Sequence, residues 1–141
     1  MNRTIPKIKT ISRNQKEYRD KLLHKMSAYN KSKVGDVGWK SLSLEIVDKN
    51  GKFIGGLTGS SFLGWFYVDL LFVDKKYRGQ GIGKRLLQEA EAWAKKKACR
   101  NINLNTITFQ SPGFYQKMGY QVFGELAYPK GNVRYYFKKR L

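Results

Sequence analysis

One continuous stretch, residues 65–96, constrains the fold of this chain more than any other. It opens with a near-continuous apolar run over residues 65–73, which is typical of a strand buried on both faces. A basic loop with three glycines follows, and apolar residues then recur at helical spacing up to about Lys97. The helical face consists of Ile82, Leu86, Leu87, Ala90, Trp93 and Ala94. This order predicts a central strand, a tight loop and an amphipathic helix.

The flanking segments complete a mixed α/β fold of strands and helices. A helix is expected over residues 15–31, and Asn50-Gly51 between two apolar runs predicts a β-hairpin. A further strand is expected over residues 102–106, and a short helix should begin at Pro112. The last two strands are expected near residues 120–123 and 133–137.

Length and composition limit the class of protein. A chain of 141 residues with 41% hydrophobic residues has room for one domain, so residues 1–141 are expected to fold together. Cys99 and His24 are the only residues of their types, which excludes an internal disulfide and a Cys/His zinc site, so no metal is expected. The N-terminus has no continuous apolar segment, and no apolar run is long enough for a membrane span. A cytoplasmic location is therefore expected.

The glycine-rich loop excludes two common phosphate-binding motifs. A P-loop would need glycine at Arg78 and Ser or Thr at Arg85, and a dinucleotide fingerprint would need glycine at Lys84. The pattern that fits is Arg78-x-x-Gly81-x-Gly83 after an apolar strand. It resembles the acetyl-CoA pyrophosphate loop of the GNAT superfamily of N-acetyltransferases.

A second segment strengthens this resemblance. Residues 114–120, Phe-Tyr-Gln-Lys-Met-Gly-Tyr, are similar to the short GNAT helix of the form F-Y-x-K-x-G-F/Y. The two motifs occur in the family's order, and the resemblance covers roughly Leu42 to the C-terminus. It implies a single GNAT-like domain, with a mixed and mostly antiparallel sheet that is flanked by helices and splayed between two central strands.

The resemblance also implies a reaction and its residues. An amine would attack the thioester of acetyl-CoA directly in a ternary complex, and acetyl-CoA would be the co-substrate. Tyr115 occupies the family position that protonates the leaving thiolate, and Asp69 is the first candidate for the general base, ahead of Glu45 and Glu125. A backbone N–H on the buried strand would stabilise the negative charge on the thioester oxygen. The residues implied in cofactor binding are Leu71, Phe72, Val73, Arg78, Gly79, Gln80, Gly81, Ile82, Gly83 and Lys84.

One position departs from the family pattern. Many members carry Asn seven residues before the catalytic Tyr, where it contacts pantetheine, and this chain has Thr108 there. Either Gln110 or Asn105 would have to supply the contact, or the contact is missing.

The net charge of +18 bears on the partners. It favours anionic ligands and repels polycations, so we expect a small-molecule amine or a neutral-to-acidic peptide as acceptor. Two alternatives stay open from the sequence, a basic nucleic-acid-binding module and an acyl-CoA sensor without turnover. Nucleic acid is the less favoured partner because no RNA- or DNA-binding motif is present. Trp39, Phe62 and the last strand offer apolar surface, so both a monomer and a homodimer fit the sequence.

Overall fold

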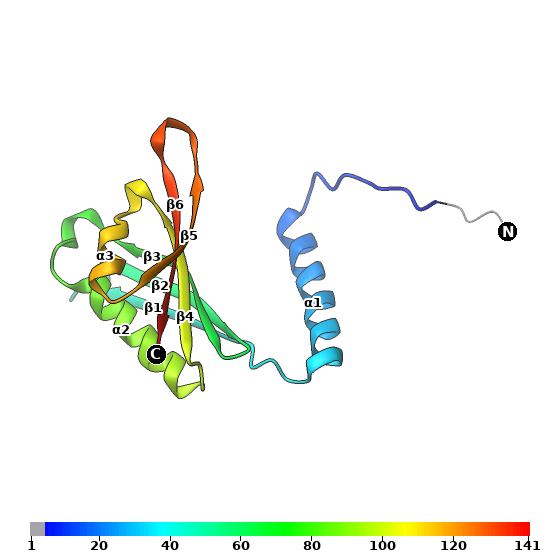
Figure 1. Ribbon diagram of the computed structural model, residues 1–141, viewed down its shortest axis with the longest axis horizontal. Helices are drawn as coiled ribbons and strands as arrows, with labels where there is room; N and C mark the ends of the chain where they lie inside the picture. The colour runs from blue at the N-terminus through cyan, green and yellow to red at the C-terminus, as the bar shows by residue number, and fades with distance from the viewer. Residues whose placement is uncertain (1–4) are drawn as a thin grey trace. The chain divides into compact units, whose positions relative to one another are not determined.

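A computed structural model describes residues 5–141, and the chain forms two compact units, Met1–Val37 and Gly38–Leu141 (Figure 1). The first unit contains α1 (Gln15–Val34), which confirms the expected helix and extends it to Val34; none of its residues is buried. The expectation of one domain over residues 1–141 stays a prediction. Within the described part of the chain, no helix combines the length and apolar character needed to cross a lipid bilayer.

The second unit is a six-stranded mixed sheet with the strand order β1-β2-β3-β4-β6-β5. Only β3 and β4 are parallel, and every other neighbouring pair is antiparallel. The strands are β1 (Lys40–Val47), β2 (Phe53–Phe62), β3 (Trp65–Val73), β4 (Asn101–Ile107), β5 (Gln121–Ala127) and β6 (Val133–Arg140). The helices are α2 (Ile82–Lys96) and α3 (Pro112–Lys117), with the 3₁₀ turns η1 (Lys75–Tyr77), η2 (Thr108–Gln110) and η3 (Pro129–Gly131). The predicted mixed α/β class is confirmed.

The expected hairpin joins β1 to β2. The Asp48 carboxylate accepts hydrogen bonds from the N–H groups of Asn50 (2.8 Å) and Lys52 (2.9 Å), which fixes the turn. Gly51 has φ 79°, a left-handed conformation that glycine adopts without steric cost. The Asn-Gly signal in the sequence therefore has a direct structural basis.

Helix α2 packs against the sheet formed by β1, β2 and β3. Ile82, Leu86, Leu87, Ala90 and Ala94 of the predicted apolar face are buried, while Trp93 is half-buried and packs its ring against Phe66 at 5.5 Å between centroids. The core is thus built by the face that the sequence pattern predicts.

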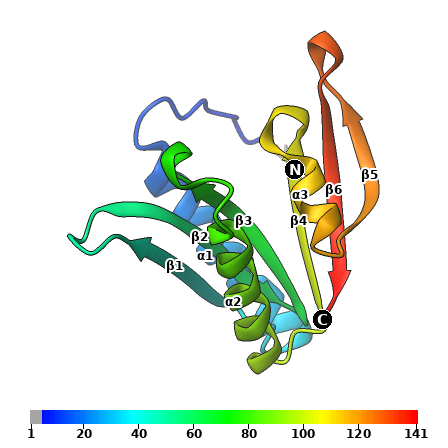
Figure 2. The ribbon, with the colours of Figure 1, turned by 90° about the vertical axis from the view of Figure 1, so that its left-hand side faces the viewer.

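The two central strands separate along their length. Parallel pairing of β3 with β4 covers only Trp65–Tyr67 against Asn101–Asn103, and beyond that point the strands diverge (Figure 2). Strand β4 stays paired with β6 up to Ile107. The expected splayed sheet is confirmed.

The expectation that residues 65–73 are buried on both faces is wrong. Phe66 and Val68 face the core under α2, whereas Leu70 is 66% exposed and Phe72 is 52% exposed. An apolar run of this length is ambiguous because it does not distinguish a strand buried on two faces from one that leaves apolar side chains exposed. One face of this part of the sheet is therefore apolar and accessible within its unit.

Gly59 provides a test of the packing between β2 and β3. A Cβ atom at Gly59 would lie 2.5 Å from Cζ of Phe66 and 2.5 Å from the carbonyl oxygen of Tyr67. Phe66 is fully buried and cannot yield, so we expect Gly59→Ala to lower the free energy of unfolding by about 1–3 kcal/mol. Urea unfolding measures the change.

Gly124→Ala is the matched control, because its Cβ atom would meet only Tyr136 at 3.8 Å. Its effect should stay within about 0.5 kcal/mol. Equal stability of the two variants would contradict the proposed close contact.

Candidate active site

The strand β3 carries a β-bulge next to the opening between β3 and β4. Leu70 pairs with Thr58 and Val68 pairs with Gly59, so Asp69 is the extra residue. The N–H of Asp74 bonds to the carbonyl of Ile54 on β2 (2.8 Å). Because backbone groups alternate along a strand, the N–H groups of Leu71 and Val73 point away from β2 into the opening, and that of Phe72 points toward β2. The bulge therefore lies beside two N–H groups directed into the opening.

The loop between β3 and α2 presents backbone N–H groups to solvent. Gly79 and Gly81 have φ values of 77° and 76° and open space where a side chain would stand. Arg85 is the first residue of α2 whose N–H reaches a carbonyl, that of Gly81 (3.0 Å). The N–H groups of the preceding residues, Gly79 to Lys84, have no acceptor among the described residues. Such a run of free donors at a helix N-terminus suits a phosphate group.

The side chains of this loop fall into two groups. Arg78 donates its Nε–H to the carbonyl of Val73 (2.9 Å) and lies over the Phe72 ring at 5.8 Å, so it links the loop to the end of β3. Gln80 and Lys84 are exposed, and the Ile82 side chain is buried in the core. Gly83 lies against Phe114, since a Cβ atom there would be 3.5 Å from its ring. Within residues 78–84, the side chains that can contact a ligand are therefore those of Arg78, Gln80 and Lys84.

Tyr115 lies on α3 among aromatic rings. It is 9% exposed, and its ring contacts those of Phe114, Tyr120 and Phe137 at centroid distances of 5.0, 6.0 and 5.7 Å. No hydrogen bond of its hydroxyl is found within residues 5–141, and this hydroxyl is not fully enclosed, because the one fully buried polar side-chain atom without a partner there belongs to Thr58. Burial raises the pKa of Tyr115 above its ordinary value of 10.0, so the hydroxyl keeps its proton at neutral pH.

A partly buried polar contact fixes the end of α3. The Tyr120 hydroxyl donates to Oε1 of Glu91 on α2 (2.8 Å), and Nζ of Lys139 on β6 donates to the same oxygen (3.0 Å) and to the carbonyl of Met118 (3.0 Å). Burial and the Glu91 carboxylate together raise the pKa of Tyr120. The contact joins α2, β6 and the end of α3, and thereby positions Tyr115.

Thr108 and Gln110 both form hydrogen bonds to backbone groups. The Thr108 hydroxyl donates to the Val133 carbonyl (3.1 Å) and accepts from the Val133 N–H (2.7 Å), so it serves the β6 backbone. The Gln110 side-chain oxygen accepts from the N–H of Ile107 (3.3 Å). Asn105 donates to the Tyr67 hydroxyl (3.3 Å) across the point where β3 and β4 separate. Of the three, Asn105 borders the opening from β4.

The carboxylates considered as general base lie in different places. Asp69 is exposed at the bulge, so the premise that it is buried in an apolar strand is wrong. Glu125 is exposed on β5. Neither has an ion-pair partner within 4.0 Å among residues 5–141. The described residues also hold no group of three or more His, Cys, Asp or Glu side chains that could bind a metal ion.

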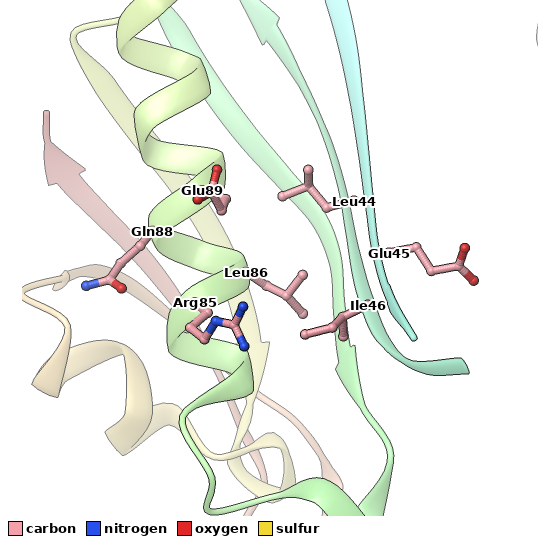
Figure 3. Close-up of a pocket in the computed structure, with 7 residues that line it drawn as sticks. All are labelled: Leu44, Glu45, Ile46, Arg85, Leu86, Gln88 and Glu89. Carbon is pink, nitrogen blue, oxygen red and sulfur yellow. The ribbon is translucent and has the colours of Figure 1, made fainter. Parts of the chain in front are cut away.

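Glu45 lies on β1 beside a hollow of about 350 Å³ between β1 and α2. Leu44 and Ile46 point toward α2, and Glu45 points away from it (Figure 3). β1 is separated from β3 by β2. The structure therefore does not bring Glu45 together with Tyr115 or with the opening.

Three residues at the opening were missed by reasoning from the sequence. Tyr67, Tyr128 and Arg134 connect to Asn105 through side-chain hydrogen bonds. Their partners lie on different strands, and Asn105 follows Tyr67 by 38 residues, so no local spacing could reveal the cluster.

The splayed sheet and the free N–H groups of the glycine loop define an acyltransferase of the GNAT type. Residues 41–122 match the family model of the acetyltransferase (GNAT) domain. The chain belongs to this family of acetyltransferases.

Three proteins that are similar to this chain are also described as acetyltransferases. The chain is 40% identical over 95 residues to the blasticidin-S acetyltransferase of Streptomyces morookaense, which covers 66% of this chain and 70% of that protein. A crystal structure of an acetyltransferase from Bacillus cereus has a TM-score of 0.80 at 36% identity, covering 96% of this chain and 98% of that chain. A candidate streptothricin acetyltransferase of Bacillus anthracis, solved with acetyl coenzyme A, has a TM-score of 0.63 at 26% identity over 72% of this chain and 62% of that chain. These findings support the use of acetyl-CoA by this chain.

The buried Tyr115 gives a testable pH dependence. Above pH 10 the unfolded chain releases the tyrosine proton and the folded chain retains it, so the folded state loses stability as the pH rises. Each such tyrosine contributes at most about 1.4 kcal/mol per pH unit. We expect Tyr115→Phe to weaken this decline between pH 9 and 11 in urea unfolding. Parallel declines for the two proteins would contradict a raised pKa of the buried Tyr115 side chain.

Proposed function

We propose that the chain transfers an acetyl group from acetyl-CoA to a primary amine by direct attack in a ternary complex. The observation that carries this proposal is the opening between β3 and β4, flanked by the unpartnered N–H groups of Gly79 to Lys84. Holding two reactants in one opening replaces a bimolecular encounter and supplies much of the rate. The acceptor is a small-molecule amine or a neutral-to-acidic peptide.

The glycine loop binds the pyrophosphate of the co-substrate. The donors are the backbone N–H groups from Gly79 to Lys84, with charge from Arg78 and Lys84. The chemistry of this donor set fits the group, because residues 78–84 combine many N–H donors with positive charge and include no carboxylate. When bound, acetyl-CoA supplies an acetyl group activated as a thioester.

Backbone N–H groups of β3 and the side chain of Tyr115 act on the thioester. The N–H groups of Leu71 and Val73 point into the opening and stabilise negative charge on the thioester oxygen, whereas Phe72 contributes no N–H there. Tyr115, whose pKa is raised by burial so that the hydroxyl keeps its proton, donates that proton to the leaving sulfur.

Asp69 is the first candidate to remove the proton from the acceptor amine. Its carboxylate is exposed at the bulge, two residues before Leu71, and can take up the proton directly or through water. Its exposure, rather than burial in an apolar strand, is the property that favours this role.

The charge of the protein bears on the acceptor. A net charge of +18 repels polyamines and lysine-rich peptides. The similarity to a blasticidin-S acetyltransferase supports a small-molecule amine. Blasticidin S and spermidine are therefore the first pair of acceptors to compare.

Gly81→Asp tests the glycine loop. The substitution adds bulk and negative charge where φ is 76°, and we expect it to abolish the calorimetric binding of acetyl-CoA. Gly64→Asp is the matched control, because Gly64 has φ 80° and equally open space but lies in the turn before β3. ATP controls for unspecific anion binding. The cofactor site would be refuted if Gly81→Asp still bound acetyl-CoA as tightly as Gly64→Asp and the parent protein do. It would also be refuted if the parent protein bound ATP as tightly as acetyl-CoA.

Tyr115→Phe tests the general acid. We expect kcat for the best acceptor to fall about 10²- to 10⁴-fold, because proton donation is lost, with the Kd for acetyl-CoA unchanged. CoA release measures turnover, and calorimetry measures binding. Unchanged kcat would exclude Tyr115 as the acid, and acetyl-CoA binding without turnover of any amine would favour the sensor alternative.

A further inference from the structure

A cluster of polar side chains spans the opening between β3 and β4. Nε of Arg134, on β6, donates to the Tyr128 hydroxyl (3.1 Å), and its Nη1 donates to Oδ1 of Asn105, on β4. Nδ2 of Asn105 in turn donates to the hydroxyl of Tyr67, on β3 (3.3 Å). The guanidinium also lies over the Tyr128 ring at 5.3 Å from its centroid. Arg134 is therefore held in one orientation by three contacts.

The charge of Arg134 has no counter-charge. Arg134 is half-buried as a residue, and its guanidinium bonds only to neutral oxygens. The ion pairs within residues 5–141 are Lys16–Asp20 and Lys139–Glu91, so no carboxylate lies within 4.0 Å of it. The Nη2 group of Arg134 has no acceptor among the described residues, so its N–H groups can donate to a ligand.

The cluster lies at the start of the opening, on the sheet face opposite α2. Pairing of β3 with β4 ends at Tyr67 and Asn103, and Asn105 and the bulge at Asp69 each follow two residues later. Phe66 and Val68 face the core under α2, so Tyr67 between them faces the other side. Strands β4 and β6 form the far wall of the opening (Figure 2).

We propose that Arg134 binds a carboxylate of the acceptor, which makes the acceptor a small primary amine that also carries a carboxylate, such as an amino acid. The inference rests on the acetyl transfer proposed above. An arginine fork fits a carboxylate with paired hydrogen bonds, and the contacts from Asn105 and Tyr128 hold the fork in place before the acceptor arrives. An amino acid with a neutral side chain has no net charge, so the net charge of +18 does not repel it as it repels polyamines.

A comparison of amino acids with their amides distinguishes recognition of the carboxylate from the intrinsic reactivity of the amine. The common amino acids that carry a primary amine, β-alanine and γ-aminobutyrate are each compared with the corresponding amide at pH 8. A neighbouring carboxylate keeps the amine protonated, so without recognition the amide would be the better acceptor. We expect the best amino acid to exceed its amide about ten- to hundredfold in kcat/KM.

Variants of Arg134 assign the effect to this side chain. Arg134→Gln should remove the preference for the carboxylate through KM, and Arg134→Lys, which keeps the charge without the fork, should retain part of it. Arg140→Gln is the matched control, because Arg140 is an exposed residue of the same strand beside Asn101, at the closed end of the opening. It should keep the full preference.

The outcomes separate this inference from the proposed function. Unchanged acetyl-CoA binding shows that an Arg134 variant is folded. Normal acetyl-CoA binding with amides equal to or better than the acids, or with no amino acid acetylated, overturns the carboxylate site alone. A preference that survives in Arg134→Gln also overturns it. Loss of acetyl-CoA binding in the parent protein overturns the proposed function itself.

Discussion

The separation of β3 from β4 is the constraint on which the rest of this structure depends. Backbone groups that leave a parallel pairing must find other partners, in water or in a ligand. The sheet tolerates this because each half is held elsewhere: β3 by β2 and α2, and β4 by β6. The glycine loop at the end of β3 and the polar cluster at its middle both border the resulting opening, so one interruption of pairing organises both candidate binding regions.

The sequence predicted the elements whose signals are local. The apolar spacing of Leu86, Leu87 and Ala90 identified α2, and Asn50-Gly51 identified the first hairpin. The glycine loop was found for the same reason, since a phosphate-binding loop is built from consecutive residues whose conformation the glycines determine. These features depend on residues that are neighbours in the sequence, so a short segment is sufficient to predict them.

Features that depend on pairing across the sheet were not accessible in this way. The exposure of Leu70 and Asp69 depends on what covers one face of β3, and the bulge at Asp69 is visible only against the register of β2. Arg134 and Asn105 lie on different strands, and nothing in either segment indicates the other. The sequence therefore predicted which segments form the candidate site, but not which side chains meet in it.

The bulge in β3 changes the direction of the backbone and leaves the packing of the core unchanged. Phe66 and Val68 before it, and Leu71 and Val73 after it, all belong to the α2 face of the sheet. A strand lacking Asp69 would therefore alternate regularly and place the same side chains in the core. Asp69 is therefore not required for the packing of the core. Its effect is on backbone direction: the extra residue bends β3 where β4 departs, and a straighter strand would have its hydrogen-bonding groups available to close the gap.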